Sequence, residues 1–410
     1  MRKFHVKNTV RYYLLTVAFL GFLFLTNDFG VTDVQKTAIV IAAGIDREED
    51  TFIITSQVAI PQSSKQGQAS EAVQIVSRGK TVGEAFEEIN AKTGWYPKLV
   101  FCDLIVLGES AKTADVFDAL DFFLRDEYLS DSCLLAVCEG SAKEILNTSA
   151  LVDPSSSTAI KKVLSAHAER VGTVLPNTLR EFAIGYFSDS RSGYLPILTT
   201  EPQQEKIGSE NEGDKKQSTH QATASQDSSS QEKSGEQPQT DKPVFSARQT
   251  ALFVGGRWVE TLKNDETFAL AAVLSKLRLA SYSIDNEKAT CTLSIRRNSP
   301  SVKLKPNEGD WFALNVDVMM TAGVLDYSLS QSIEQIGDVG DVPKEYFTFA
   351  AHKLAGEIES VYEKCRAVGC DVFGVRERLV KYEKRRFKDR QDTAFQNTRI
   401  QVDVRFENVR

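Results

Sequence analysis

The sequence has few of the residues that most metal sites require. It contains four histidines among 410 residues, and no two of its six cysteines form a C-x-x-C pair. Zinc sites usually combine several His and Cys ligands at short spacings, so we expect neither a bound metal nor a cofactor. A disulfide framework is not expected either. The histidines are His5, His167, His220 and His352, and the cysteines are Cys102, Cys133, Cys138, Cys291, Cys365 and Cys370.

Common nucleotide-binding and hydrolase motifs are also missing. The sequence contains no G-x-G-x-x-G, H-E-x-x-H or G-x-S-x-G. Gly79-Lys80-Thr81 ends like a phosphate-binding loop, but Gln74 stands where that loop needs its first glycine. Thr81 instead begins T-V-G-E, a capping box that starts a helix. We therefore predict a chain without catalytic or cofactor-binding residues, which is not an enzyme.

Carboxylates offer the remaining route to catalysis or metal binding. Asp115, Asp118 and Asp121 repeat at intervals of three, a spacing typical of the solvated face of a helix. Asp46 follows an apolar strand, where capping a turn is the commoner role. We assign neither set to a site.

Charge is unevenly distributed along the chain. The net charge is −7, although Arg2, Lys3, Lys7 and Arg11 make the first eleven residues basic. The remainder is therefore still more acidic, which argues against a nucleic-acid surface, because phosphate binding needs clustered Lys and Arg.

One uncharged apolar run, Tyr12–Leu25, follows the basic residues. Its fourteen residues would form a helix of about 21 Å, short of the ~30 Å hydrocarbon core of a bilayer. No small-x-small cleavage site follows, which favours an uncleaved anchor over a signal peptide or a buried core helix. We predict a cytoplasmic tail over 1–11, a single-pass anchor or signal segment over 12–28, and a folded body on the outer side.

The rest of the chain divides into two folded parts. Residues 36–200 mix strands and helices, with helix predicted throughout Pro154–Ser188. Residues 201–244 are rich in Gln, Ser, Glu and Lys, a composition typical of a disordered linker. Residues 245–410 form the second part. Together these patterns predict an α+β fold of about three subdomains behind one N-terminal helix.

Two features of the second part are well marked. Gly255-Gly256 lies between two strand-like segments and predicts a tight hairpin, after which Asn264 is expected to cap a helix. A long helix is predicted over 343–368, because apolar residues recur there at intervals of three and four. These residues are Phe347, Ala351, Leu354, Ile358, Val361, Cys365 and Val368.

Taken in order, these segments resemble the Ger(x)C family, the C subunits of GerA-type spore germination receptors. The resemblance covers roughly 38–200 and 245–407. It rests on AIVIAAGID (38–46), GKTVGEAFEEI (79–89), KLVFCDLIVLGESAK (98–112), ALDFFLRDEYLS (119–130), CEGSAKEIL (138–146), TALFVGGRWVETLKNDETFAL (250–270) and CDVFGVRERLVKY (370–382).

The resemblance implies a non-enzymatic receptor subunit at the inner spore membrane, with A-type and B-type receptor subunits as partners. Family members are typically lipidated on a cysteine just after the apolar run. Here the first cysteine is Cys102, so no lipidation is expected and the N-terminal helix would replace that anchor. The resemblance does not identify the germinant or any residue that contacts it. The alternative from another class is an extracytoplasmic protein that binds a small solute or a cell-wall fragment.

Overall fold

The computed structural model describes most of both predicted parts. The described residues are 3–25, 37–59, 72–148, 153, 155–165, 172–201, 244–286, 289–306, 312–329, 344–387 and 391–408. Most of the predicted linker, 202–243, therefore lies outside the described residues, as do His167 and His220.

The larger of two sheets has ten strands in the order β10-β9-β8-β6-β5-β1-β2-β3, with β4 paired to β1 and β7 to β6. Its middle is parallel, because β1, β5, β6 and β8 run in the same direction, whereas both ends are antiparallel. The strands are β1 Thr37–Glu48, β2 Thr51–Ala59, β3 Ala72–Gly79, β4 Tyr96–Lys98, β5 Leu104–Leu107, β6 Leu134–Cys138, β7 Asn177–Thr178, β8 Ser192–Glu201, β9 Val244–Val254 and β10 Arg257–Leu262.

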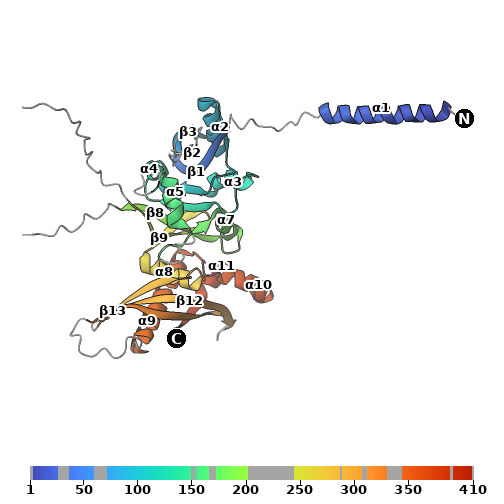
Figure 1. The fold of residues 1–410 in the computed structure, drawn as a ribbon. Helices are drawn as coiled ribbons and strands as arrows, with labels where there is room; N and C mark the ends of the chain where they lie inside the picture. Colours follow the sequence, from blue (N-terminus) through green and yellow to red (C-terminus); the bar gives the residue numbers. More distant parts are fainter. Residues whose placement is uncertain are drawn as a thin grey trace, which may run out of the picture.

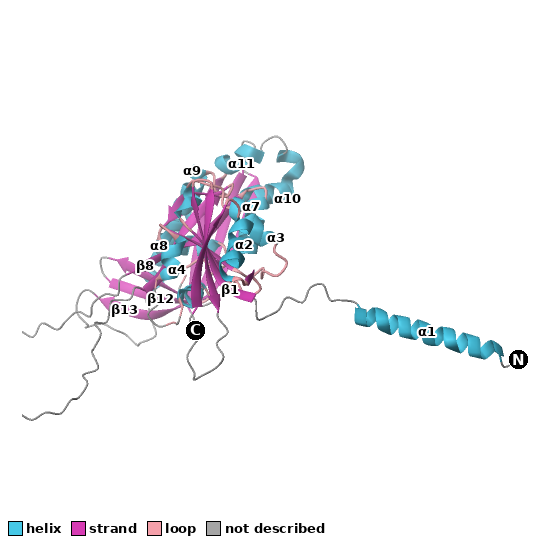
Figure 2. Cartoon of the chain, turned by 90° about the horizontal axis from the view of Figure 1, so that it is seen from above, coloured by secondary structure: helices cyan, strands magenta, loops and turns pink. Residues whose placement is uncertain are grey.

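Helices cover both faces of this sheet, on either side of the strands when the molecule is seen from above (Figure 2). One face packs against α2 (Val82–Thr93), α3 (Phe117–Arg125) and α7 (Leu179–Phe187), and the other against α4 (Ala142–Asn147) and α5 (Ser156–Leu164). The approach of α4 to β1 is close: a Cβ on Gly44 would lie 2.8 Å from Leu146 Cδ1. The central strands, such as β2, β5 and β6, are thus buried on both faces, which explains their continuous apolar runs.

The smaller sheet forms the other end of the body, with β12, β13 and α9 in orange to red (Figure 1). Its order is β11-β12-β13-β14, and β13 and β14 are parallel. Helix α8 (Asn264–Val273) shares its core with this sheet. The remaining elements are β11 Ala280–Asn286, β12 Ala289–Pro306, β13 Phe312–Leu329, α9 Lys344–Val368, α10 Val375–Phe387, α11 Gln391–Asn397 and β14 Arg399–Asn408.

This architecture confirms the predicted α+β class with more than one sheet-based unit. The predicted linker does not, however, separate the two sheets. Strands β8 and β9 pair antiparallel from Ser192 opposite Val254 to Glu201 opposite Val244, so the segment between them leaves from the end of a hairpin. The first strands after the predicted linker, β9 and β10, therefore complete the larger sheet.

Most predictions of local structure are confirmed. Thr81 Oγ1 accepts a hydrogen bond of 3.1 Å from Glu84 N, as its capping role requires. The Gly255-Gly256 turn joins β9 to β10 with positive φ at both residues, 54° and 77°, which glycine adopts at little cost. The long helix begins at Lys344, one residue after its predicted start.

Two local predictions were wrong. The segment Pro154–Ser188 is not one helical stretch, because strand β7 and residues without helical structure precede α7. The cap of α8 is Lys263 and not Asn264: Lys263 N donates a hydrogen bond of 2.8 Å to the Glu266 carboxylate, and Asn264 is the first helical residue.

The N-terminal segment forms the helix α1, Lys3–Leu25. Within the described part of the chain, no helix combines the length and apolar composition that a membrane crossing requires. The single-pass anchor predicted over 12–28 is therefore not supported, and the physical reason is the shortness of the apolar run, about 21 Å.

The apolar stripe of α9 is buried against the smaller sheet and α8. Leu354, Ile358 and Val361 are each 0% exposed. We predict that Ile358→Ala lowers the free energy of unfolding by roughly 2–5 kcal/mol, because it leaves a cavity in this core. Chemical denaturation of the full chain measures the change, with the exposed Glu359→Ala as the control, which should stay within about 0.5 kcal/mol. An Ile358→Asp protein of unchanged stability would contradict the assignment.

Candidate functional site

A short turn after α9 joins the smaller sheet to the larger one. Cys370 Sγ donates a hydrogen bond of 3.4 Å to Phe253 O on β9, and Asp371 N donates one of 2.9 Å to Ser192 Oγ on β8. Cys370 and Asp371 are 0% and 1% exposed. The turn therefore fixes the start of α10 directly on the larger sheet.

The carboxylate of Asp371 determines where α10 begins. Its two oxygens accept hydrogen bonds from Val375 N at 2.8 Å and Arg376 N at 2.7 Å, two amides of the first helical turn that have no partner within the helix. Burial raises the pKa of Asp371 to about 6, because desolvation of the charged form outweighs the two amide bonds that lower it.

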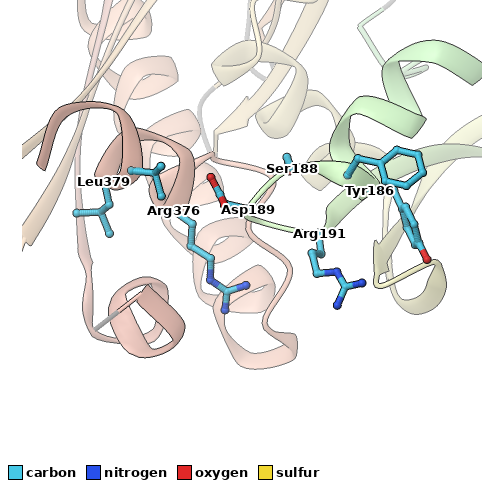
Figure 3. A pocket seen from close by; sticks show the side chains of 8 residues that line it. Tyr186, Ser188, Asp189, Arg191, Arg376 and Leu379 are labelled. Carbon is cyan, nitrogen blue, oxygen red and sulfur yellow. The ribbon is translucent and has the colours of Figure 1, made fainter. Parts of the chain in front are cut away.

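A cleft of about 460 Å³ lies between α10 and the segment that connects α7 to β8. Arg376 on α10 and Arg191 on the connecting segment extend to the same side, whereas the side chain of Asp189, which also lines the cleft, points the other way (Figure 3). The cleft thus combines side chains from both of the predicted folded parts. The lining residues are Tyr186, Phe187, Ser188, Asp189, Arg191, Arg376, Leu379 and Val380.

Hydrogen bonds fix the conformation of the connecting segment. Ser190 Oγ lies 2.7 Å from Ser188 Oγ, and Ser190 O accepts bonds from Ser192 Oγ at 2.8 Å and Arg376 Nη1 at 3.4 Å. Arg191 has a positive φ of 47°, an uncommon conformation for a residue with a Cβ, and its carbonyl accepts Gly255 N at 2.8 Å. Arg191 is therefore presented to the cleft by a backbone that the larger sheet holds in place.

Tyr186 forms the other wall of the cleft. Its ring stacks on Phe117 with a centroid distance of 3.6 Å, and its hydroxyl donates to Asp115 Oδ2 at 3.1 Å. Burial, and then this hydrogen bond, raise the pKa of Tyr186. Asp115 also accepts Phe117 N at 2.9 Å and lies against the turn glycine Gly256, where no Cβ would fit.

The chemistry of the cleft is that of binding. Two guanidinium groups and one carboxylate line a small volume, an arrangement that suits an anionic or zwitterionic small molecule. The lining residues include no nucleophile paired with a base. Across the described residues, no group of three or more His, Cys, Asp or Glu side chains is placed to hold a metal ion.

The carboxylates considered in the sequence are used structurally. Asp46 accepts Ser141 Oγ and Ala142 N, both at 2.8 Å, and so caps α4 across the sheet. Asp118 pairs with Arg47 at 3.0 Å and Asp121 with Arg125 at 2.7 Å. These two are exposed, as the spacing of three predicted, whereas Asp115 is the half-buried residue that holds Tyr186.

The residues that make the cleft were not predicted from the sequence. CDVFGVRERLVKY (370–382) was recognised as a family segment, but no role was assigned to Asp371 or Arg376 within it. Arg191 lies in a loop without any motif. A buried-looking Asp four residues before the first turn of a helix was the available signal for Asp371.

The raised pKa of Asp371 predicts a pH-dependent stability. The folded state binds its proton more tightly than the unfolded state, whose value is near the ordinary 3.8, so the contribution is complete below about pH 4 and is lost as pH rises through 6. Asp371→Asn removes this titration. Relative to the wild type, the variant should therefore gain up to about 3 kcal/mol in free energy of unfolding between pH 4 and pH 7.

Denaturation curves at several pH values measure this difference. The exposed Ser281→Ala, which removes no titrating group, serves as the control and should show a nearly constant difference from the wild type. A constant difference for Asp371→Asn as well would mean that the buried carboxyl does not titrate in this range.

Comparison with known proteins agrees with the resemblance noted in the sequence. Residues 30–200 match the spore germination protein N-terminal domain, and residues 248–410 match the spore germination B3/GerAC-like C-terminal domain. Spore germination protein B3 of Bacillus subtilis (strain 168) is 30% identical over 138 residues, 32% of this chain and 36% of that protein. The alignment thus spans about a third of this curated relative.

The fold is similar to the crystal structure of the GerBC protein, with a TM-score of 0.51 at 15% identity, over 90% of this chain and 97% of that one. This similarity supports the fold alone, while the two domain matches cover most of the sequence in the expected order. The chain therefore belongs to the Ger(x)C family of spore germination proteins, whose members are membrane-associated proteins of germinant receptors.

Proposed function

We propose that this chain is the C subunit of a nutrient-germinant receptor and takes part in the response to nutrients without catalysing a reaction. The observation that carries the proposal is the presence of both family domains, in order, over 30–200 and 248–410. The cleft chemistry is consistent with it, because its arginines and carboxylate suit binding and lack a nucleophile–base pair.

The proposed partners are the A-type and B-type subunits of the receptor, at the inner spore membrane. The surface of α1 supports attachment to an apolar phase. Leu14, Leu15 and Phe19 are 60–64% exposed, and no described side chain of the body covers them. A contiguous exposed apolar surface of this kind marks a contact with a membrane or a partner.

We call the cleft lined by Arg191 and Arg376 the junction cleft, and we propose that binding there changes the position of α10 relative to the segment that connects α7 to β8. A ligand or a partner side chain between Arg191 and Arg376 would contact α10 and the segment that connects α7 to β8 together. The alternative function, binding of a free solute or a cell-wall fragment outside a receptor, uses the same cleft. Its volume of about 460 Å³ lies within the range of small-molecule sites.

Germination of spores that lack this chain tests the receptor function. We predict that they lose the response to a nutrient while responding normally to a nutrient-independent trigger, and that the other subunits co-purify with the tagged wild-type chain. Complementation with Arg191→Gln and Arg376→Gln probes the cleft, and Asp121→Asn is the control. Unchanged nutrient germination together with high-affinity solute binding by the purified chain would favour the alternative.

Membrane attachment through α1 can be tested by substitution. We predict that Leu14→Gln, Leu15→Gln and Phe19→Gln together move the chain from the membrane to the soluble fraction, because the helix loses three large, exposed apolar side chains. Fractionation of sporulating cells measures the distribution. Phe101→Gln, at a position on the body that is 57% exposed, is the matched control. Full retention of the triple variant in the membrane would exclude α1 as the attachment.

A further inference from the structure

A second cleft lies on the opposite side of α10, between that helix and β12. Its volume is about 570 Å³. Strand β12 contributes one wall and the first two turns of α10 contribute the other. The lining residues are Val302, Lys303, Leu304, Lys305, Glu377, Arg378, Lys381 and Tyr382.

This cleft is basic in a protein whose net charge is −7. Lys303 and Lys305 are exposed and stand two residues apart, so they project from the same face of β12. Arg378 and Lys381 are three residues apart and therefore share a face of α10. Glu377 is the one acidic side chain among the lining residues. The basic cleft thus concentrates positive charge from two elements that are far apart in the sequence.

The lysine charges are available to a ligand. Among the described ion pairs of this region, none involves Lys303, Lys305 or Lys381. The ammonium group of Lys381 lies 5.3 Å from the ring centroid of Tyr382, which is 68% exposed. Arg378 differs, because its guanidinium donates to Phe373 O and, at 2.9 Å, to Gly374 O. Arg378 therefore adds a positive charge of fixed position to the lining of the basic cleft.

We propose that the basic cleft binds a phosphate group. Three lysine ammonium groups with rotatable donors, next to a fixed guanidinium, suit an anion with several oxygens and up to two charges better than they suit a single carboxylate. The exposed ring of Tyr382 is placed to contact the organic part of a phosphate ester. This site is independent of the junction cleft, and its existence does not rest on the receptor function.

The phosphate has two possible sources with the same chemistry, a soluble phosphate compound or the headgroup of an anionic phospholipid. Lysines near an anionic membrane surface each contribute about 1 kcal/mol of attraction, so three of them favour binding by about a hundredfold. The two sources are distinguished by testing inorganic phosphate in solution and phosphatidylglycerol in vesicles separately.

The test compares two triple variants of the full chain. The cleft variant carries Lys303→Ala, Lys305→Ala and Lys381→Ala. The control variant carries Lys80→Ala, Lys143→Ala and Lys263→Ala, at exposed positions away from the basic cleft. Both change the net charge equally, so a difference between them reports position and not total charge. Thermal unfolding verifies folding, and the milder Lys303→Gln with Lys305→Gln replaces the cleft variant if that variant is unstable.

The first arm titrates inorganic phosphate at constant ionic strength by calorimetry, with succinate as a dicarboxylate comparison. The second arm measures flotation with vesicles of phosphatidylcholine, with and without phosphatidylglycerol. If the source is soluble, the cleft variant should bind phosphate at least tenfold more weakly than the wild type. If it is a lipid, the cleft variant should lose about a hundredfold in preference for phosphatidylglycerol. The control variant should retain wild-type behaviour in either case.

Three outcomes would overturn the proposal. One is wild-type chain that binds neither phosphate nor phosphatidylglycerol. Another is an equal loss of phosphate or phosphatidylglycerol binding in the cleft and control variants, which would show that binding depends on total charge and not on the basic cleft. The last is succinate binding as tight as phosphate binding, which would assign the site to carboxylates.

Discussion

The buried carboxylate of Asp371 is the interaction on which the arrangement of the C-terminal region depends. Its oxygens accept the first free amides of α10, while the backbone N–H of the same residue binds Ser192 on β8. Asp371 thus specifies both where α10 begins and how α10 is attached to the larger sheet. Burying a charged carboxylate costs free energy. The hydrogen bonds from Val375 N and Arg376 N offset part of this cost and so stabilise the cap.

The position of α10 follows from this constraint. One side of the helix lines the junction cleft with Arg376 and Leu379, and another side lines the basic cleft with Arg378 and Lys381. A displacement of α10 would change both clefts together. It would also disturb the core of the smaller sheet, because Val375 and Leu379 of α10 are buried in the same cluster as α9. The segment CDVFGVRERLVKY (370–382) therefore carries a structural joint and part of the lining of both clefts, which gives a physical reason for it to be recognisable in sequence.

Local structure could be predicted from the sequence where the signal is itself local. The apolar stripe of α9, the Thr81 cap and the Gly255-Gly256 turn depend on residues within a few positions of one another. The pairing of strands that are far apart in the sequence could not be predicted in this way. The composition of 201–244 indicates a linker between folded segments. The alternation of residues in a strand does not specify which strand it pairs with. Nothing local indicates that β9 returns to β8 and completes the larger sheet.

The same reasoning explains why neither cleft was predicted. Arg191 and Arg376 are far apart in the sequence and meet because the Asp371 turn binds β8 and β9. Lys303 and Lys381 meet because α10, once capped, lies against β12. In a chain of net charge −7, scattered lysines and arginines look like ordinary solvated residues until the fold gathers them. The basic character of these surfaces is thus a property of tertiary structure, and the Asp371 cap is one of the contacts that place α10 where it gathers these side chains.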